Sequence, residues 1–170
     1  MKVSKNFNLK EFVSPLTWRR FGLKSIWFID PKIIVIAQLL RDITGASVTI
    51  NDWHLEGRYK YSGYRPPFIV RIKKIFANRF EPIKTLSAFL KIVKRYKIGA
   101  AESQHKMGRA IDVKVEGLRS VEVYNIVMAH SAEFIKAGLT AIEDVEKTPT
   151  WVHLDCRNTA SKNELLIIQP

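Results

Sequence analysis

The sequence has one cysteine, few acidic side chains and no long apolar run. A single cysteine, Cys156, excludes an internal disulfide framework and suits a reducing compartment. No apolar run approaches the roughly 18 residues that a membrane-spanning helix needs. The amino-terminal region lacks an apolar segment followed by a small-residue cleavage site, so we expect no secretory signal and synthesis in the cytoplasm.

Acidic side chains are outnumbered, because 16 Asp and Glu face 28 Lys and Arg and leave a net charge of +12. Between Pro66 and Lys97, nine basic residues face only Glu81 and leave +8. These basic residues are Arg71, Lys73, Lys74, Arg79, Lys84, Lys91, Lys94, Arg95 and Lys97. Such a patch indicates either a solvated helix face or a polyanionic partner. Anionic cell-wall polymers and acidic membrane surfaces are candidates, and nucleic acid ranks below them because no base-reading motif is present.

Length and composition predict one globular domain, residues 1–170. The chain is 46% hydrophobic and 11% aromatic, which is enough for a sizeable core. Helical periodicity with start and stop signals predicts helices at 9–14, 31–44, 68–80, 82–97, 120–128 and 132–137. Alternation predicts strands at 47–50 and 111–115 and a β-hairpin from 139 to 157. We expect an irregular stretch at 18–29 with its aromatic rings in the core, and a peripheral tail beyond Asn158.

Residues 103–115 combine a turn with a strand. The apolar residues of 111–115 alternate with Asp112, so this carboxylate lies on the face opposite the apolar side chains. His105 precedes Gly108, a residue that lets the backbone turn, so its imidazole can be brought round to face Asp112.

A second alternating run, 151–155, places His153 on the same strand face as Trp151 and Asp155. Two imidazoles and one carboxylate leave a fourth position open, as in a catalytic zinc site. The alternative is that His153 is an ordinary packed strand residue and Asp112 a turn carboxylate.

The residues around these candidate ligands resemble peptidase family M15, the zinc peptidases of the D-alanyl-D-alanine carboxypeptidase and phage endolysin type. The matching motifs are Ser103-Gln-His-Lys-Met-Gly-Arg-Ala-Ile-Asp112, Trp151-Val-His-Leu-Asp155 and Ser62-Gly-Tyr-Arg65. The resemblance begins at Asn6-Phe-Asn-Leu-Lys-Glu-Phe12 and extends to about Arg157. It implies the α+β fold that this family shares with the Hedgehog signalling domain, with a small antiparallel sheet carrying the zinc site and helices packed on one face. The segment 66–98 looks longer than usual and is a possible basic helical insertion.

The resemblance implies that His105, Asp112 and His153 bind Zn2+. It also implies a general base, which in several family members is an acid three positions before the last histidine. Thr150 occupies that position here, so this assignment cannot be carried over. The predicted hairpin brings Glu143 or Asp144 back to the level of His153, and we favour Glu143 as the base.

Five further residues receive supporting roles. The resemblance implies that Arg65 holds a substrate carboxylate or polarises the scissile carbonyl, and the alternative is a structural arginine paired with a buried acid. We expect Ser103 and Gln104 to bind the substrate backbone or to steady the ligands. Asp155, with Trp151 beside it, is expected to support His153, and Asp155 is also a candidate base.

Together these assignments predict a zinc metallopeptidase that cuts peptidoglycan stem or cross-link peptides in phage-type cell-wall lysis or entry. We expect a monomer that reaches the wall after release from the cell or as a virion component, and that holds anionic wall polymers through the basic segment 66–97. The alternative is a non-catalytic, metal-containing binding module of the same fold for cell wall or nucleic acid, which Thr150 keeps open.

Overall fold

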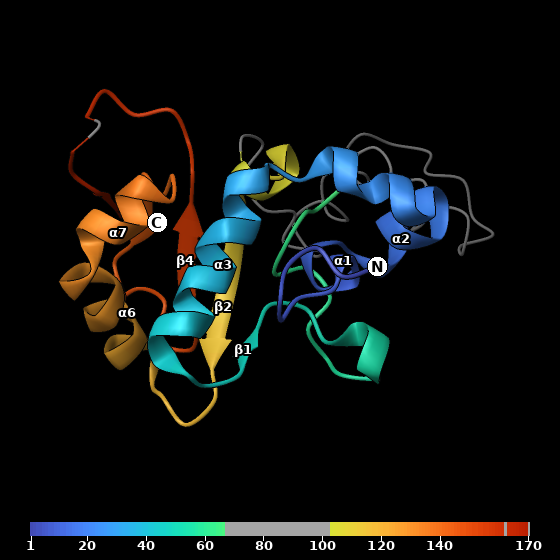
Figure 1. Cartoon of the computed structure of the whole chain (residues 1–170), viewed down its shortest axis with the longest axis horizontal. Coiled ribbons are helices and arrows are strands. Elements are labelled where there is room, and N and C mark those ends of the chain that lie inside the picture. The colour runs from blue at the N-terminus through green and yellow to red at the C-terminus, as the bar shows by residue number, and fades with distance from the viewer. Residues whose placement is uncertain (67–102, 162, 170) are drawn as a thin grey trace, which may run out of the picture.

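The structure, a computed structural model, describes residues 1–66, 103–161 and 163–169 and has helices packed on a five-stranded sheet (Figure 1). The α-helices are α1 (Leu9–Phe12), α2 (Pro15–Phe21), α3 (Pro31–Thr44), α6 (Ser120–Ala129) and α7 (Ser131–Lys136). The 3-10 helices are η1 (Gly22–Phe28), η2 (Trp53–Leu55) and η3 (Gln104–Met107). The strands are β1 (Val48–Thr49), β2 (Ala110–Val115), β3 (Ala141–Glu143), β4 (Val152–Asp155) and β5 (Leu166–Ile168).

The strand order is β1-β2-β4-β3-β5, and every neighbouring pair is antiparallel except β3 and β5. The predicted α+β class and the β3–β4 hairpin are therefore confirmed. The prediction of a wholly antiparallel sheet with a peripheral tail is wrong at one edge, because the tail beyond Asn158 returns as β5 and pairs in parallel with β3. Three successive apolar residues, Leu166–Ile168, form this edge strand.

Alternation along the strands separates an apolar face of the sheet from a polar face. Across β2 and β4, Ile111 lies opposite Leu154 and Asp112 lies opposite His153. Because successive side chains of a strand point to opposite faces, these two pairs lie on opposite faces of the sheet. The apolar face belongs to the same buried cluster as the apolar side chains of α3, α6 and α7. These helices and the apolar face thus share one core, and the polar face carries the candidate metal ligands.

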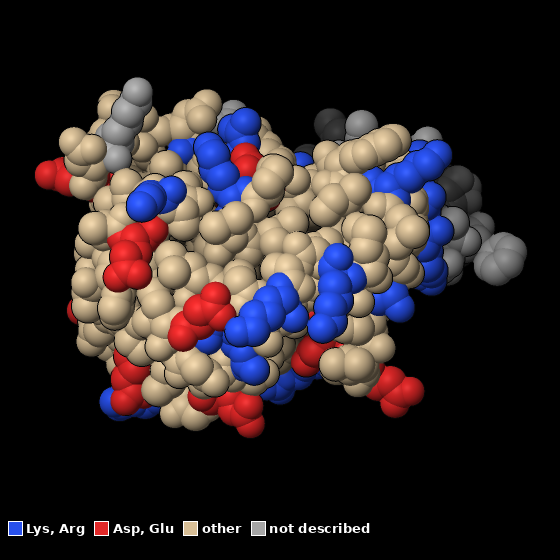
Figure 2. All heavy atoms as spheres, in the orientation of Figure 1, with Lys and Arg blue, Asp and Glu red and all other residues tan. Residues whose placement is uncertain are grey.

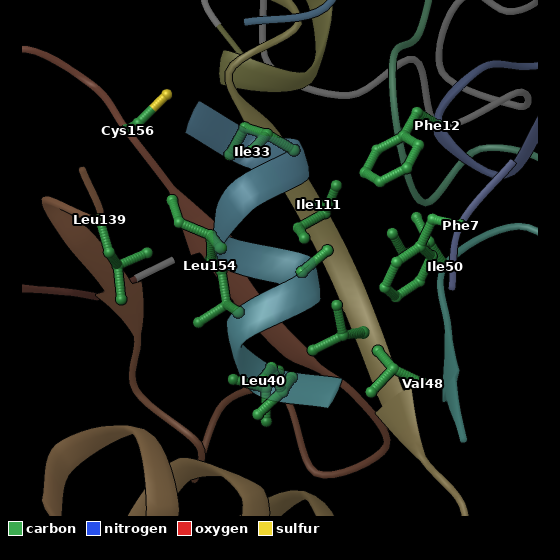
Figure 3. Packing of buried hydrophobic residues seen from close by; sticks show 14 of the residues in the cluster. Phe7, Phe12, Ile33, Leu40, Val48, Ile50, Ile111, Leu139, Leu154 and Cys156 are labelled. Carbon is green, nitrogen blue, oxygen red and sulfur yellow. The ribbon is translucent and has the colours of Figure 1, made fainter. Parts of the chain in front are cut away.

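The central helix of the covering layer is α3, which crosses in front of β2 and β4 (Figure 1). Asp30 caps it by accepting a bond from the backbone N–H of Lys32, Pro31 occupies its first turn, and Gly45 ends it in the left-handed conformation at φ 64°. Its buried side chains are Ile33, Ile36, Ala37 and Leu40. Ile33 and Leu40 lie in the same buried cluster as Ile111 and Leu154 of the sheet (Figure 3), so α3 shares its core with the two site-bearing strands.

The stretch 18–29 differs from its prediction, because it forms most of α2 and η1 rather than irregular chain. Ser14 caps α2 by accepting a bond from the N–H of Thr17, and Pro15 occupies the first helical position. The rings are not all in the core, since Trp27 is 79% exposed. The aromatic side chains obscured the helical pattern of this segment. Its start signals are Ser14 and Pro15.

Some predictions have no structural test here. The helices expected at 68–80 and 82–97, and with them the basic insertion at 66–98, lie outside the described residues. Among the described helices, none combines the length and apolar character needed to cross a bilayer.

Gly108 ends η3 in the left-handed conformation, at φ 69°, directly against the chain that precedes α3. Its carbonyl oxygen accepts a bond from the N–H of Asp30 at 3.0 Å, and a Cβ atom at this position would lie 1.7 Å from the carbonyl oxygen of Phe28. No side chain fits in that space, so glycine is required both by the backbone conformation and by the close approach. This contact fixes the turn that carries His105.

We expect Gly108→Ala to destabilise the fold far more than Gly45→Ala. Both glycines have positive φ, but nothing lies within 4 Å of a Cβ atom at Gly45. Gly45→Ala should cost about 1 kcal/mol for the left-handed conformation alone, whereas Gly108→Ala should cost at least about 2 kcal/mol more because the backbone must move. Urea unfolding of both variants measures the difference, and equal costs would contradict the close contact at Gly108.

Candidate metal centre

Three side chains converge on the polar face of the sheet with one ligand atom each. The Nε2 atom of His105 lies 3.1 Å from Oδ1 of Asp112 and 3.2 Å from Nδ1 of His153. The Nδ1 atom of His153 lies 2.8 Å from Oδ1 of Asp112. These residues form a group that could hold a metal ion, and it is the triad predicted from the sequence.

His105 is oriented by the backbone of the loop that holds Arg65. Its Nδ1 atom lies 3.0 Å from the carbonyl oxygen of Gly63, which can only accept, so Nδ1 carries the hydrogen and Nε2 keeps its lone pair. The backbone N–H of Arg65 donates in return to the carbonyl oxygen of His105 at 3.0 Å. Because the imidazole is buried, its pKa lies below the ordinary value, which favours the neutral ring that binds a metal.

His153 is oriented by Asp155 from the same face of β4. Its Nε2 atom lies 3.2 Å from Oδ2 of Asp155, and Arg157 donates from its Nε and Nη2 atoms to the same carboxylate. Burial raises the pKa of Asp155, but the bonds from His153 and Arg157 outweigh it and hold the pKa below the ordinary value. An ionised carboxylate only accepts, so Nε2 of His153 is the donor and Nδ1 is the atom that faces the centre.

Asp112 is held by a cation and by the edge of β2. Its Oδ2 atom accepts a bond of 2.7 Å from Nη2 of Arg65, which leaves Oδ1 for the two imidazoles. Its backbone N–H donates to the carbonyl oxygen of Ser62 at 2.7 Å, so the loop 62–65 is hydrogen-bonded to the edge of β2 beside the site. Burial raises the pKa of the carboxyl group, but the neighbouring His105 and His153 more than offset this and keep the pKa far below the ordinary value.

Three observations indicate that the triad is suited to hold a cation. Each ligand has its outward polar atom bonded to a partner, and its other polar atom faces the shared centre. The ligand atoms are 2.8 to 3.2 Å apart, close to the roughly 3.3 Å expected between ligands of a tetrahedral ion with metal bonds of about 2.0 Å. Burial lowers the pKa of His153, but the bonds to Asp112 and Asp155 outweigh it and raise the pKa to about 9, so the centre favours a positive charge, here a proton that a bound metal ion would displace.

Glu143 lies beside this centre on the third strand, β3. Its Oε1 atom is 4.0 Å from Nδ1 of His153, the atom that faces the centre, and its side chain is partly buried. Burial raises its pKa above the ordinary value and so makes the carboxylate a stronger base. Asp144 instead accepts bonds from the backbone of Glu146 and from Nε2 of Gln169, which places it in the turn. The geometry therefore favours Glu143 over Asp144 as the acid next to the triad.

The other predicted residues lie around the centre. Arg65 donates to Asp112 and, from Nε, to the carbonyl oxygen of Tyr61, an arrangement that matches the structural alternative weighed for it. Ser103 precedes η3, where its carbonyl oxygen accepts from the N–H of Lys106. The Oε1 atom of Gln104 is buried without a hydrogen-bond partner among the described residues.

Trp151 directly precedes β4. It lies at the edge of the polar face and is 36% exposed, and Nζ of Lys114 lies 5.5 Å from the centroid of its ring. No contact of this ring with His153 is seen in the described part of the chain, so support of that ligand by Trp151 stays a prediction.

Two parts of the site were not anticipated from the sequence. The first is Arg157, which neutralises Asp155; its position two residues after Asp155, just beyond the end of β4, was the available signal. The second is the carbonyl oxygen of Gly63, which sets the tautomer of His105. No sequence pattern indicates which backbone carbonyl an imidazole will meet, because that contact depends on how a distant loop packs.

His153→Ala should weaken metal binding strongly, and His130→Ala should leave it unchanged. Loss of a ligand should cost more than the 10- to 100-fold that loss of an outer partner typically costs, that is, more than about 100-fold. His130 is an exposed surface histidine that pairs with Glu133, so its variant controls for the loss of one imidazole. Titration with Zn2+ under a competing chelator measures the affinity. Equal affinities of the two variants would contradict the site.

Asp155→Asn should lower metal affinity by about 10- to 100-fold without abolishing binding, because it removes the charge that orients His153. Glu116→Gln, at an exposed acid just after β2, is the matched control. Substitution with Co2+ adds a second readout, since its visible spectrum reports the ligand geometry. An unchanged affinity and an unchanged Co2+ spectrum in Asp155→Asn would show that His153 does not depend on this carboxylate.

Comparison of the chain with protein families, curated proteins and solved structures found no match. The centre is therefore identified by its own geometry. Two imidazoles and a carboxylate converge on one point, each is held by a named partner, and a second carboxylate lies beside them.

Proposed function

We propose that this chain is a zinc-dependent peptidase that hydrolyses a peptide bond in peptidoglycan stem or cross-link peptides. The observation that carries the proposal is the position of Glu143, whose carboxylate lies 4.0 Å from the metal-facing nitrogen of His153. A metal triad alone is equally suited to a structural site. A basic carboxylate beside it provides the second group that hydrolysis needs.

Zinc is the metal that the donor set favours. Two imidazole nitrogens and one carboxylate oxygen are a common protein ligand set for catalytic zinc, with the fourth position left for water or substrate. When bound, zinc would supply Lewis acidity that polarises a carbonyl group and lowers the pKa of a water molecule. His105, Asp112 and His153 would hold it through the three atoms that face the centre.

Glu143 is the proposed proton acceptor. Its raised pKa suits a group that takes a proton from the attacking water at one carboxylate oxygen and then returns it to the leaving amine. Because β3 pairs with β4 next to His153, the sheet itself sets the position of this oxygen. Thr150, which stands where the resemblance places the base, is replaced in this role by an acid from the neighbouring strand.

Arg65 is the proposed link between the substrate and the ligand set. Its Nη2 atom holds Asp112, so the guanidinium fixes which carboxylate oxygen faces the centre. A guanidinium has five N–H donors. The Nε and Nη2 atoms of Arg65 donate to Tyr61 and Asp112, and its other donors make no hydrogen bond to the described residues, so they are available for a substrate carboxylate or carbonyl oxygen. Arg65 is thus primarily a positioning residue.

The substrate class comes from the motif resemblance. The motifs at 62–65, 103–112 and 151–155 are similar to those of peptidases that act on D-amino-acid-containing wall peptides. A phage-type enzyme that reaches the wall after release or as a virion component, with anionic wall polymers as partners of the basic segment 66–97, is the corresponding biological setting.

A second candidate is a metal-containing binding module without catalysis. The observation that favours it is Thr150 at the position expected for the base. The two candidates differ in one measurable property, because a binding module would retain peptidoglycan and leave its peptides intact.

Glu143→Gln should lose about 10²- to 10⁴-fold in cleavage rate while it still binds Zn2+, because the amide cannot accept the proton. Glu146→Gln, in the adjacent turn, is the matched control and should cleave at the wild-type rate. The assay is digestion of purified peptidoglycan by zinc-loaded protein with mass analysis of the released peptides, and the masses identify the bond.

Two outcomes separate the hypotheses. Cleavage by Glu143→Gln at the wild-type rate would show that Glu143 is not the general base, and the protein would then be a peptidase that uses another base. Absence of any cleaved peptide from several wall chemotypes, together with retention of the protein on the wall, would contradict the peptidase and support the binding module.

A further inference from the structure

The surface of α2 and η1 combines exposed apolar side chains with exposed cations. Leu23 is 57% exposed and Trp27 is 79% exposed. The exposed cations of the same segment are Arg19, Arg20 and Lys24. No acidic residue occurs from Pro15 to Ile29. Figure 2 shows Lys and Arg side chains along the edge of the molecule where Figure 1 places α2.

The fold holds these apolar side chains outward. Thr17 and Ser25 are buried, while Ile26 and Phe28 pack against the core, so the opposite side of the segment faces outward. Phe28 also stacks on Tyr64, with ring centroids 5.2 Å apart and an interplanar angle of 9°. The exposure of Trp27 therefore follows from an anchored backbone and not from a free end.

A third apolar side chain extends this surface. Met107, at the end of η3, is 53% exposed and lines a surface hollow together with Trp27 and Phe28. Arg109 and Asp30 line the same hollow and pair with each other at 3.9 Å, so Arg109 is not counted among the cations of this surface. Leu23, Trp27 and Met107, with Arg19, Arg20 and Lys24, are called the α2–η1 surface below.

Exposed apolar side chains that gather on one surface mark an interaction site, whereas single ones are ordinary. Leu55 is such a single case, since it is 75% exposed on η2, outside this surface. An anionic wall polymer would use the cations and leave the apolar side chains in water, and single-stranded nucleic acid would use the cations and the ring of Trp27 but leave Leu23 and Met107 in water. A lipid bilayer with anionic headgroups uses both, because cations meet the phosphates while Trp and Leu enter the acyl boundary.

We propose that the α2–η1 surface docks the protein on the surface of an anionic lipid bilayer. The cations lie among the headgroups, and Leu23, Trp27 and Met107 insert at the interface without crossing the membrane. Docking of this kind is a binding function of its own, and it does not depend on metal or on peptide cleavage.

The first test is sedimentation of the full chain with vesicles of phosphatidylglycerol and phosphatidylcholine, compared with vesicles of phosphatidylcholine alone. We expect retention on the anionic vesicles only. The double variant Leu23→Ala/Trp27→Ala keeps all charges, so it isolates the apolar contact and should bind about tenfold more weakly. Leu55→Ala is the matched control and should bind as the wild type does.

The second test places Trp27 in the membrane directly. Trp27→Phe stays apolar and should still bind, but vesicles with brominated lipids should quench its fluorescence far less than that of the wild type, because Trp18, Trp53 and Trp151 remain outside the bilayer. No retention on anionic vesicles, equal retention on phosphatidylcholine, retention of the double variant at the wild-type level, or equal quenching in Trp27→Phe would each overturn the proposal.

Discussion

The pairing of β2 with β4 is the constraint on which the candidate site depends. In this register Asp112 lies directly opposite His153, and the neighbouring pair of Ile111 and Leu154 lies on the other face. A slip of one residue would send every side chain of one strand to the other face. Burial of the apolar pair under α3 therefore also holds the candidate metal ligands on the polar face, so the core specifies the site.

Partners on the outer side of the triad then select the atoms that face its centre. Gly63 holds one nitrogen of His105, Asp155 holds one nitrogen of His153, and Arg65 holds one oxygen of Asp112. Each of the three side chains is left with one polar atom directed at the same point. Two anions, Asp112 and Asp155, are each matched by an arginine, so the centre is prepared for a cation without a large excess of negative charge.

Local signals in the sequence were enough for much of this arrangement. Asp30, Pro31 and Gly45 predicted the bounds of α3, and alternation at 111–115 and 151–155 predicted both ligand strands and the face that they share. The same signals gave a wrong prediction for 18–29, where the aromatic side chains obscured a helix. They also gave a wrong prediction for the tail, where three apolar residues pair with β3, which lies well before them in the sequence. The sequence also left open whether Glu143 or Asp144 lies next to His153. The choice depends on which of the two side chains points to the polar face, and this is set by the register of β3 with β4 across a turn of unknown length. The contact of His105 with the carbonyl oxygen of Gly63 could not be predicted from the sequence, because only the packed fold brings these two groups together.

The most direct measurement of the central claim is anomalous diffraction at the zinc edge from crystals of the zinc-loaded protein. The account predicts one strong peak on the polar face of the sheet, within about 2.2 Å of Nε2 of His105, Oδ1 of Asp112 and Nδ1 of His153. It also predicts that the opposite ring nitrogens keep their bonds to Gly63 and Asp155. A peak at another group, a peak bound through the opposite ring nitrogens, or no peak at this triad would contradict it.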